Sequence, residues 1–439
     1  MKCRHRFCPA CRRSGSKPAM SMASVTVQMI GRVSKMVSGS LSGVCRLICI
    51  ALLLACAAHS GQNAAQSYLR QADPASAYLA DPSDGLAAVN AFAAELQTNP
   101  QFIISSSDAD AARASLVRRP LNATLLSFYG LRAASVGKSG LADALMASAD
   151  AASRRDAFSQ LWMVEQKSGA NDVRGALRHY NALLSVYPAM QATLLPVLVS
   201  ASAYPEVRSA MRPYLRAETR WSFPLLDLAS QRAEVGDYRD LVEPIVPRLR
   251  DDGYAASNAR IIHRMLQSGL AGDAWKFFSL AAPSVDVRAF RDFAPRGANL
   301  DPQWQPLSWT LGQSVDISAS VAGRGAIDAS MAPTAGGLIA SRDVAVISSS
   351  TYVLGHRLIY EPGSPRASLL WRVYCVTPAE PQLIVERFMP ATEGINLVRL
   401  PVNVPENCHL MRVELSAVGS EGQWNSVAQI AELALTRAE

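Results

Sequence analysis

Apolar residues recur at helical spacing through residues 64–283, a region rich in Ala, Leu and Arg. A glycine closes each of four apolar patterns and precedes the next: Gly137, Gly169, Gly236 and Gly269. The intervals are 32, 67 and 33 residues, and 67 is close to twice 33, with a different turn at 201–205 where the missing glycine would fall. Because glycine adopts the left-handed conformation that often follows a helix end, this spacing predicts repeated helix pairs.

A two-helix repeat of about 33 residues resembles the tetratricopeptide-type solenoids. The best copy runs from Leu161-Trp162 to Gly169 and continues through Ala176, Tyr180 and Pro188. The resemblance implies an α-solenoid over residues 64–283, with roughly four to five helix pairs and a curved surface for a protein partner. Trp162, His179 and Tyr180 are candidates to line this surface. The favoured interpretation is that Trp162 and Tyr180 pack between helices and that His179 faces solvent.

The pattern changes after Pro283, where a linker over residues 284–302 leads into alternating apolar and polar positions. Met411, Val413 and Leu415 share one face of a predicted strand. Arg412, Glu414 and Ser416 share the other face, and Trp371, Val373 and Cys375 share one side of a second strand. Residues 303–439 are therefore predicted to form an antiparallel β-sandwich, which makes the chain an α+β multidomain protein.

Two segments of this region, Asn299–Leu311 and Gln429–Leu435, resemble the opening and closing strands of jelly-roll carbohydrate-binding modules. That resemblance implies a polysaccharide partner, held by exposed aromatic side chains that stack on sugar rings. Trp304 and Trp424 lie in polar, loop-like contexts and are the candidate glycan-binding residues. Trp309 and Trp371 are predicted to belong to the core, because a sandwich needs large inward side chains.

Residues 118–439 also resemble bacterial envelope proteins in which a tetratricopeptide-like region precedes such a module. The residues that carry the resemblance are Gln160–Trp162, Gly175–Tyr180, Trp371 with Cys375, and Val404-Pro405 with Cys408. Such proteins often accompany polysaccharide synthesis or export, and this role is what the resemblance implies for the chain.

Residues 1–58 are predicted to be an export signal or anchor behind an extended N-terminus, because they hold an apolar run at Leu47–Ala58 and no acidic residue. Ala55–Ala57 is a small-residue site for ordinary cleavage. Leu53–Cys56 resembles a bacterial lipobox, which makes Cys56 the candidate lipid-modified residue. Cleavage, lipidation and an uncleaved membrane anchor all stay open, and each places the protein in the periplasm or envelope membrane.

The charge of the chain changes once this leader is set aside. The sequence has 43 Lys and Arg and 36 Asp and Glu; nine of the basic residues lie in residues 1–58, which leaves 34 against 36. The basic pI of the whole chain therefore comes from the leader, and a nucleic-acid partner is not expected.

Six of the eight cysteines lie in the leader, which leaves Cys375 and Cys408. An even pair in an exported protein predicts a disulfide, with two half-buried thiols as the alternative. Cys3, Cys8 and Cys11 lack the second ligand pair that a structural zinc site needs, so no metal is expected.

No catalytic motif is present, and nothing in the spacing pairs the carboxylates Asp316, Glu361, Glu386 and Glu406. No cofactor is expected. The sequence favours an exported, non-catalytic envelope scaffold that binds protein partners and glycan. The alternatives are a protein-only scaffold with a structural β module, and a polysaccharide-modifying enzyme.

Overall fold

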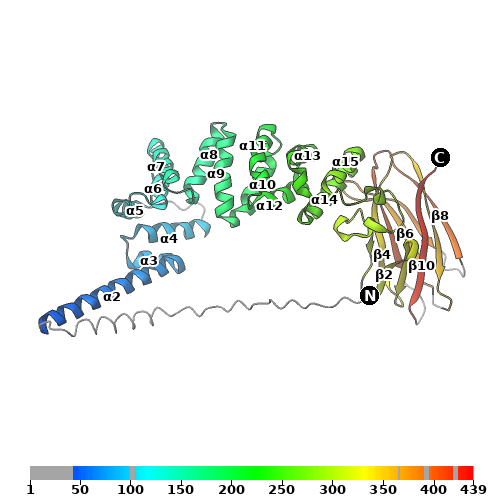
Figure 1. Ribbon diagram of the computed structural model, residues 1–439, viewed down its shortest axis with the longest axis horizontal. Coiled ribbons are helices and arrows are strands. Elements are labelled where there is room, and N and C mark those ends of the chain that lie inside the picture. The colour runs from blue at the N-terminus through cyan, green and yellow to red at the C-terminus, as the bar shows by residue number, and fades with distance from the viewer. Residues whose placement is uncertain (1–42, 99–103, 364–365, 390–394, 419–423, 439) are drawn as a thin grey trace, which may run out of the picture. The chain divides into compact units, whose positions relative to one another are not determined.

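The computed structural model describes residues 43–98, 104–363, 366–389, 395–418 and 424–438 (Figure 1). Contacts divide the chain into two compact units, Met1–Leu145 and Met146–Glu439. The second unit therefore joins the later helices to the whole β-sandwich. Most of the predicted leader, with Cys3, Cys8 and Cys11, lies outside the described residues.

The first unit is helical. Its elements are α2 (Gly43–Ala72), α3 (Pro74–Ala80), α4 (Gly85–Thr98), α5 (Ser106–Arg118), α6 (Ala123–Ser135) and the first half of α7 (Ser139–Ala152). Within the described residues, the segment Ile48–Ala72 of α2 is long and apolar enough to cross a membrane, with a mean hydropathy of 1.4. A signal sequence near the N-terminus meets the same test, so length and composition do not separate the two.

The helices of the second unit follow one another in pairs. They are α8 (Ala157–Gly169), α9 (Val173–Val186), α10 (Gln191–Ala201), α11 (Pro205–Arg216), α12 (Ser222–Arg232), α13 (Val235–Val242), α14 (Ala255–Gln267) and α15 (Ala271–Ala281). Alternate helices α10, α12 and α14 contact one another in succession, which makes the apolar core continuous along the array. Aspartates begin the first pair: Asp156 accepts from the backbone N of Ser159, and Asp172 from that of Gly175.

The predicted glycine turns are only partly present. Gly137 and Gly269 have φ of 76° and 75° and lie between paired helices, as predicted. The left-handed residue after α8 is instead Asn171, with φ of 57°. Gly236 lies inside α13, so the prediction of a turn there is wrong. At Gly269 a larger residue is disfavoured for two reasons: φ is positive, and an added Cβ would lie 3.0 Å from the ring of His409, which would have to shift.

The C-terminal region is a β-sandwich of two antiparallel five-stranded sheets. Sheet A has the order β1-β4-β9-β6-β7, and its strands are Thr310–Leu311, Gly336–Ala345, Leu410–Val418, Leu369–Cys375 and Gln382–Met389. Sheet B has the order β2-β3-β10-β5-β8, and its strands are Ile317–Ala322, Ala326–Met331, Ser426–Arg437, Thr351–Tyr360 and Ile395–Asn403. This is the predicted fold class: helices followed by a jelly-roll-type antiparallel sandwich.

The sandwich core confirms the predicted strand faces. Met411, Val413 and Leu415 are buried between the sheets, and Trp309 and Trp371 are buried there too. The indole Nε1 of Trp371 donates to Nε2 of the buried His356 at 2.9 Å. Neutral His356 therefore carries its proton on Nδ1.

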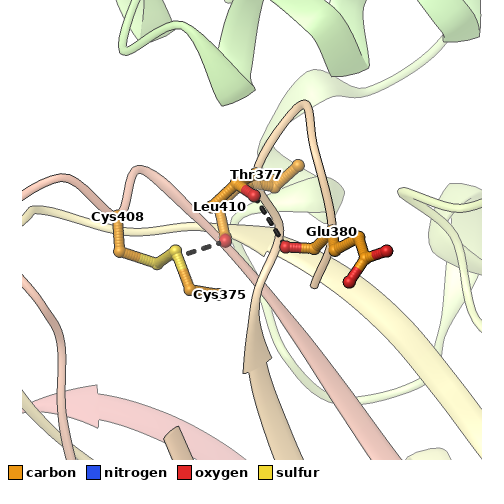
Figure 2. The surroundings of a disulfide bond; sticks show 5 residues. All are labelled: Cys375, Thr377, Glu380, Cys408 and Leu410. Carbon is orange, nitrogen blue, oxygen red and sulfur yellow. Dashed lines mark hydrogen bonds between the residues drawn. A yellow bond between two sulfur atoms is a disulfide. The ribbon is translucent and has the colours of Figure 1, made fainter. Parts of the chain in front are cut away.

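Cys375 and Cys408 form the predicted disulfide. Figure 2 shows it beside the carbonyl oxygen of Leu410, with the turn after β6 held by a bond from Thr377 Oγ1 to the Glu380 carbonyl. Val376 donates its backbone N–H to Leu410 at 2.9 Å. Both Val376 and Leu410 belong to the helical core, so the disulfide lies where the sandwich meets the helices.

The predicted linker is part of a packed junction segment, residues 284–309. It folds into three short 3-10 helices, η4 (Val287–Phe290), η5 (Gly297–Leu300) and η6 (Pro302–Trp304). The buried guanidinium of Arg342, on β4, donates to the carbonyls of Phe290, Asp292 and Leu307 at 2.6, 2.6 and 2.8 Å. Burial lowers the pKa of Arg342 to about 10, which keeps it charged near neutral pH. These bonds hold the segment against sheet A.

Replacing both Cys375 and Cys408 with Ala is expected to lower the free energy of unfolding. The disulfide closes a loop with a sequence separation of 33, which corresponds to about 3–4 kcal/mol of lost chain entropy in the unfolded state. Urea unfolding of the full chain and the double variant measures the difference. An unchanged midpoint with an unchanged slope would contradict the prediction.

Acid is expected to destabilise the fold through His356. Burial lowers the pKa of His356 to about 4 from its ordinary 6.5. Between pH 6.5 and 4, His356 is protonated in the unfolded chain but stays neutral in the folded chain. The free energy of unfolding therefore falls by up to about 3 kcal/mol as the pH is lowered through this range. His356→Gln keeps an acceptor for Trp371 and cannot be protonated. The variant should show a smaller fall in chemical-denaturation stability from pH 6.5 to 4 than the parent; equal falls would rule out this source.

Candidate functional site

The two predicted glycan-binding tryptophans have opposite environments. Trp424, just before β10, is 77% exposed and remains available for stacking. Trp304 is only 4% exposed, so its prediction as a surface residue is wrong. Its ring packs 4.4 Å from that of Phe278 on α15 and 6.4 Å from that of Phe290, measured between centroids. Trp304 therefore fills the core between helices and sandwich rather than contacting a ligand.

Two other predicted residues lie on helices. Cys56 is exposed on α2, and its lipidation stays a prediction. His179 is wholly buried on α9, so the prediction that it faces solvent is wrong. Its Nδ1 lies 2.8 Å from Gln160 Oε1, and Gln160 Nε2 donates to Asp150 at 2.7 Å. Burial lowers the pKa of His179, so this polar side chain is held neutral by the helix packing around it.

A row of charged side chains crosses the outer face of sheet A, opposite the core. The register places Asp343 beside Arg412, Arg412 beside Tyr374, Glu414 beside Arg372, and Arg372 beside Glu386. Directly paired residues of an antiparallel ladder lie on one face with Cβ atoms about 5 Å apart. The row therefore brings four strands together, and it is called the sheet A row below: Asp343, Arg372, Tyr374, Glu386, Arg412 and Glu414.

One end of the sheet A row is fixed to the helices. The side chain of Asp343 is 1% exposed and accepts from Arg412 Nε and Nη2 at 2.8 and 3.1 Å. His263 Nε2, on α14, donates at 2.7 Å to Oδ2 of Asp343, the oxygen that also accepts from Arg412 Nη2. Arg412 therefore neutralises the buried carboxylate and His263 adds a further hydrogen bond, so Arg412 is held in one orientation. The Asp343 carboxylate raises the pKa of Arg412 in return.

The middle of the row keeps unused hydrogen-bonding capacity. Arg372 Nε donates to Glu386 at 2.7 Å. The half-buried Glu414 carboxylate and Tyr374 hydroxyl, in contrast, make no hydrogen bond within the described part of the chain. Burial raises the pKa of Glu414, and the Asp343 charge adds to the rise against the influence of Arg412. The Glu414 carboxylate and the Tyr374 hydroxyl thus lie between the guanidinium groups of Arg372 and Arg412, each of which is bonded to a carboxylate.

Phe388 borders the row. It lies two residues beyond Glu386 on the same face of edge strand β7 and is 56% exposed. An exposed ring beside alternating donors and acceptors suits a flat ligand that carries many hydroxyls. Among the described residues no three His, Cys, Asp or Glu side chains gather in a way that could hold a metal ion.

Sequence reasoning placed Arg412 and Glu414 on the outer face but did not find the row. The row depends on which residues of β4, β6 and β7 stand opposite them. The alternation along β6, with Arg372 and Tyr374 between core residues, was the available signal.

Comparisons with known proteins found similar structures but no related sequence. No protein-family model matches the chain. No curated protein matches it either. A structure described as "CBM4 structure and function" is 10% identical with a TM-score of 0.27, covering 33% of this chain and 97% of its own. A xylan-binding domain from CBM 22 is 13% identical with a TM-score of 0.22, covering 30% and 86%. The N-terminal cellulose-binding domain of β-1,4-glucanase C from Cellulomonas fimi is 12% identical with a TM-score of 0.22, covering 30% and 91%.

The two tryptophans should respond differently to truncation. Trp304→Ala is expected to lower the free energy of unfolding by about 3–5 kcal/mol, because it leaves a cavity in the junction core. Trp424→Ala is expected to change it by less than about 0.5 kcal/mol, because the ring is exposed. Urea unfolding of both variants measures the contrast. Similar stabilities for the two would contradict the burial of Trp304.

Proposed function

We propose that this protein is a non-catalytic polysaccharide-binding protein of the bacterial envelope, and that the sheet A row is its glycan site. The observation that carries the proposal is the pair of unused groups, Glu414 and Tyr374, between the held guanidinium groups of Arg372 and Arg412. Sugar hydroxyls both donate and accept, so they can use an acceptor, a phenol and two guanidinium edges in one plane. The exposed ring of Phe388 offers a face for the apolar side of the sugar.

The charge arrangement favours binding over cleavage. Glycoside hydrolysis uses an acidic pair that faces one bond, with one carboxyl free to act as acid or base. In the sheet A row, Asp343 and Glu386 are each bonded to an arginine, and Glu414 is the one carboxylate of the row without such a bond among the described residues. An open sheet face also suits a long chain, which can lie across the strands. We therefore assign the row to recognition of a polymer.

The envelope location and partners belong to the same proposal. The apolar helix α2 supports export, with the chain kept at a membrane by the helix or by a lipid on Cys56, or released by cleavage. The disulfide suits an oxidising compartment. The stacked helices, with exposed Val197, Tyr204 and Phe223, would hold a protein partner during polysaccharide assembly or export.

Tyr374→Ala and Glu414→Gln are each expected to weaken glycan binding at least 10-fold, because each removes a group that the fold leaves unused. Glu414→Gln should not lower stability, because burial raises the pKa of Glu414 and so makes the ionised carboxyl less favourable in the folded chain than in the unfolded chain. Affinity electrophoresis of the full chain through gels containing the neutral polysaccharides xylan, β-1,4-glucan or β-1,3-glucan measures binding. Thermal unfolding measures stability.

The matched controls lie on the outer face of sheet B. Leu397→Ala removes an exposed apolar side chain there, and Asp328→Asn makes the same carboxyl-to-amide change on β3. Both should migrate like the parent chain in every gel. The proposal fails if no polysaccharide retards the parent, or if the controls lose as much retardation as the sheet A variants.

A further inference from the structure

A hollow of about 510 Å³ lies on the helical side of the second unit, away from the residues of the sheet A row. One wall is a face of α15 that carries Trp275, Lys276 and Ser279. The other wall is the segment that follows α15, including Arg288 and Arg291. The volume falls within the range of pockets that hold small ligands. It is called the α15 hollow below.

Three cationic side chains line the α15 hollow. Lys276, Arg288 and Arg291 make no ion pair within the part of the chain that the structure describes. Asp286, which also lines the hollow, accepts from the backbone N of Arg288 at 3.0 Å and so caps the short helix η4. Neighbouring carboxylates are engaged elsewhere, with Asp273 paired to Arg239 and Asp292 to Arg296. The hollow therefore has an excess of positive charge.

Trp275 gives this positive hollow a rigid apolar surface. Its ring is half-buried and stacks on Phe278, with centroids 6.2 Å apart and an interplanar angle of 22°. Phe278 in turn packs against Trp304 in the junction core. A solvent-facing tryptophan held in this way keeps its position before a ligand arrives, which lowers the entropy lost on binding.

A ligand that uses both features needs a ring with an apolar face and an attached anion. Arginine forks match carboxylates in bidentate geometry, and lysine adds a point charge. Tryptophan offers its face to the C–H groups of a sugar ring. We propose that the α15 hollow binds a carboxylated sugar, a uronate unit of an acidic polysaccharide. This site is separate from the sheet A row and selects for charge, so it goes beyond the proposed function.

Isothermal titration calorimetry of the full chain with hexagalacturonate tests the inference. The double variant Arg288→Gln/Arg291→Gln is expected to bind at least 10-fold more weakly, because it removes two of the three unpaired cations. Binding by the parent should also weaken as salt rises from 50 to 500 mM, since the attraction is screened. Arg216→Gln/Arg220→Gln removes the same charge from exposed arginines outside the hollow and should bind like the parent.

Further arms separate this site from simpler explanations. Cellohexaose, the neutral ring polymer, should not displace hexagalacturonate. Inorganic phosphate should bind far more weakly than hexagalacturonate; equal affinity would identify a general anion site and overturn the assignment. Tyr374→Ala should retain hexagalacturonate binding, because it leaves the α15 hollow intact. A failure of the sheet A proposal can therefore be told apart from a failure of this one. The proposal would also be overturned if the parent chain did not bind hexagalacturonate, or if the two double variants bound it equally well.

Discussion

The structure of the second unit depends on one buried cation. Arg342 points from β4 into the junction and donates to three main-chain carbonyls of the segment that joins helices to sandwich. Because the guanidinium of Arg342 is buried away from water, losing any one of these hydrogen bonds would leave a buried donor without a partner. This requirement holds a loop-like segment in one conformation. The same segment delivers Trp304 to the helical core and Trp309 to the sandwich core.

Both proposed binding surfaces take their rigidity from this junction. Trp275 in the α15 hollow is held through Phe278, which Trp304 supports. In the sheet A row, Arg412 is held by Asp343, whose backbone N donates to Pro306 of the junction segment and whose carboxylate meets His263. Surfaces of exposed side chains bind specifically only when some of those side chains are fixed beforehand. In this protein a single packed segment, the junction segment, fixes side chains of both surfaces.

The sheet A row also shows how a protein keeps polar groups available. In the row, the buried carboxylate of Asp343 is paired with the guanidinium of Arg412, which compensates its desolvation. The exposed Glu386 is paired with Arg372. Glu414 is left with a raised pKa, a small cost in stability at neutral pH. Groups that the fold leaves unsatisfied are the ones with capacity to bind something else. His263 is likewise bonded to a partner, Asp343, and so stabilises the fold.

Local pattern was enough to determine several features. Alternation along β9 placed Met411 inside and Arg412 outside, because successive side chains of a strand must point to opposite faces. The burial of Trp309 and Trp371 followed from the volume that a sandwich core needs. The pairing of Cys375 with Cys408 followed from there being one pair in the module. The helical spacing likewise predicted an array of helix pairs before the sandwich.

Only the tertiary structure decided how these parts meet. Trp304 lies in a polar segment, but its burial depends on Phe278 and Phe290, which approach it in space. His179 can be buried because its Nδ1 finds a hydrogen-bond partner in Gln160 Oε1 of the preceding helix, and no local pattern predicts that contact. The sheet A row needs the register of four strands, which is set by long-range pairing. Local sequence thus determined which face each side chain takes, while contacts between distant segments determined what it faces.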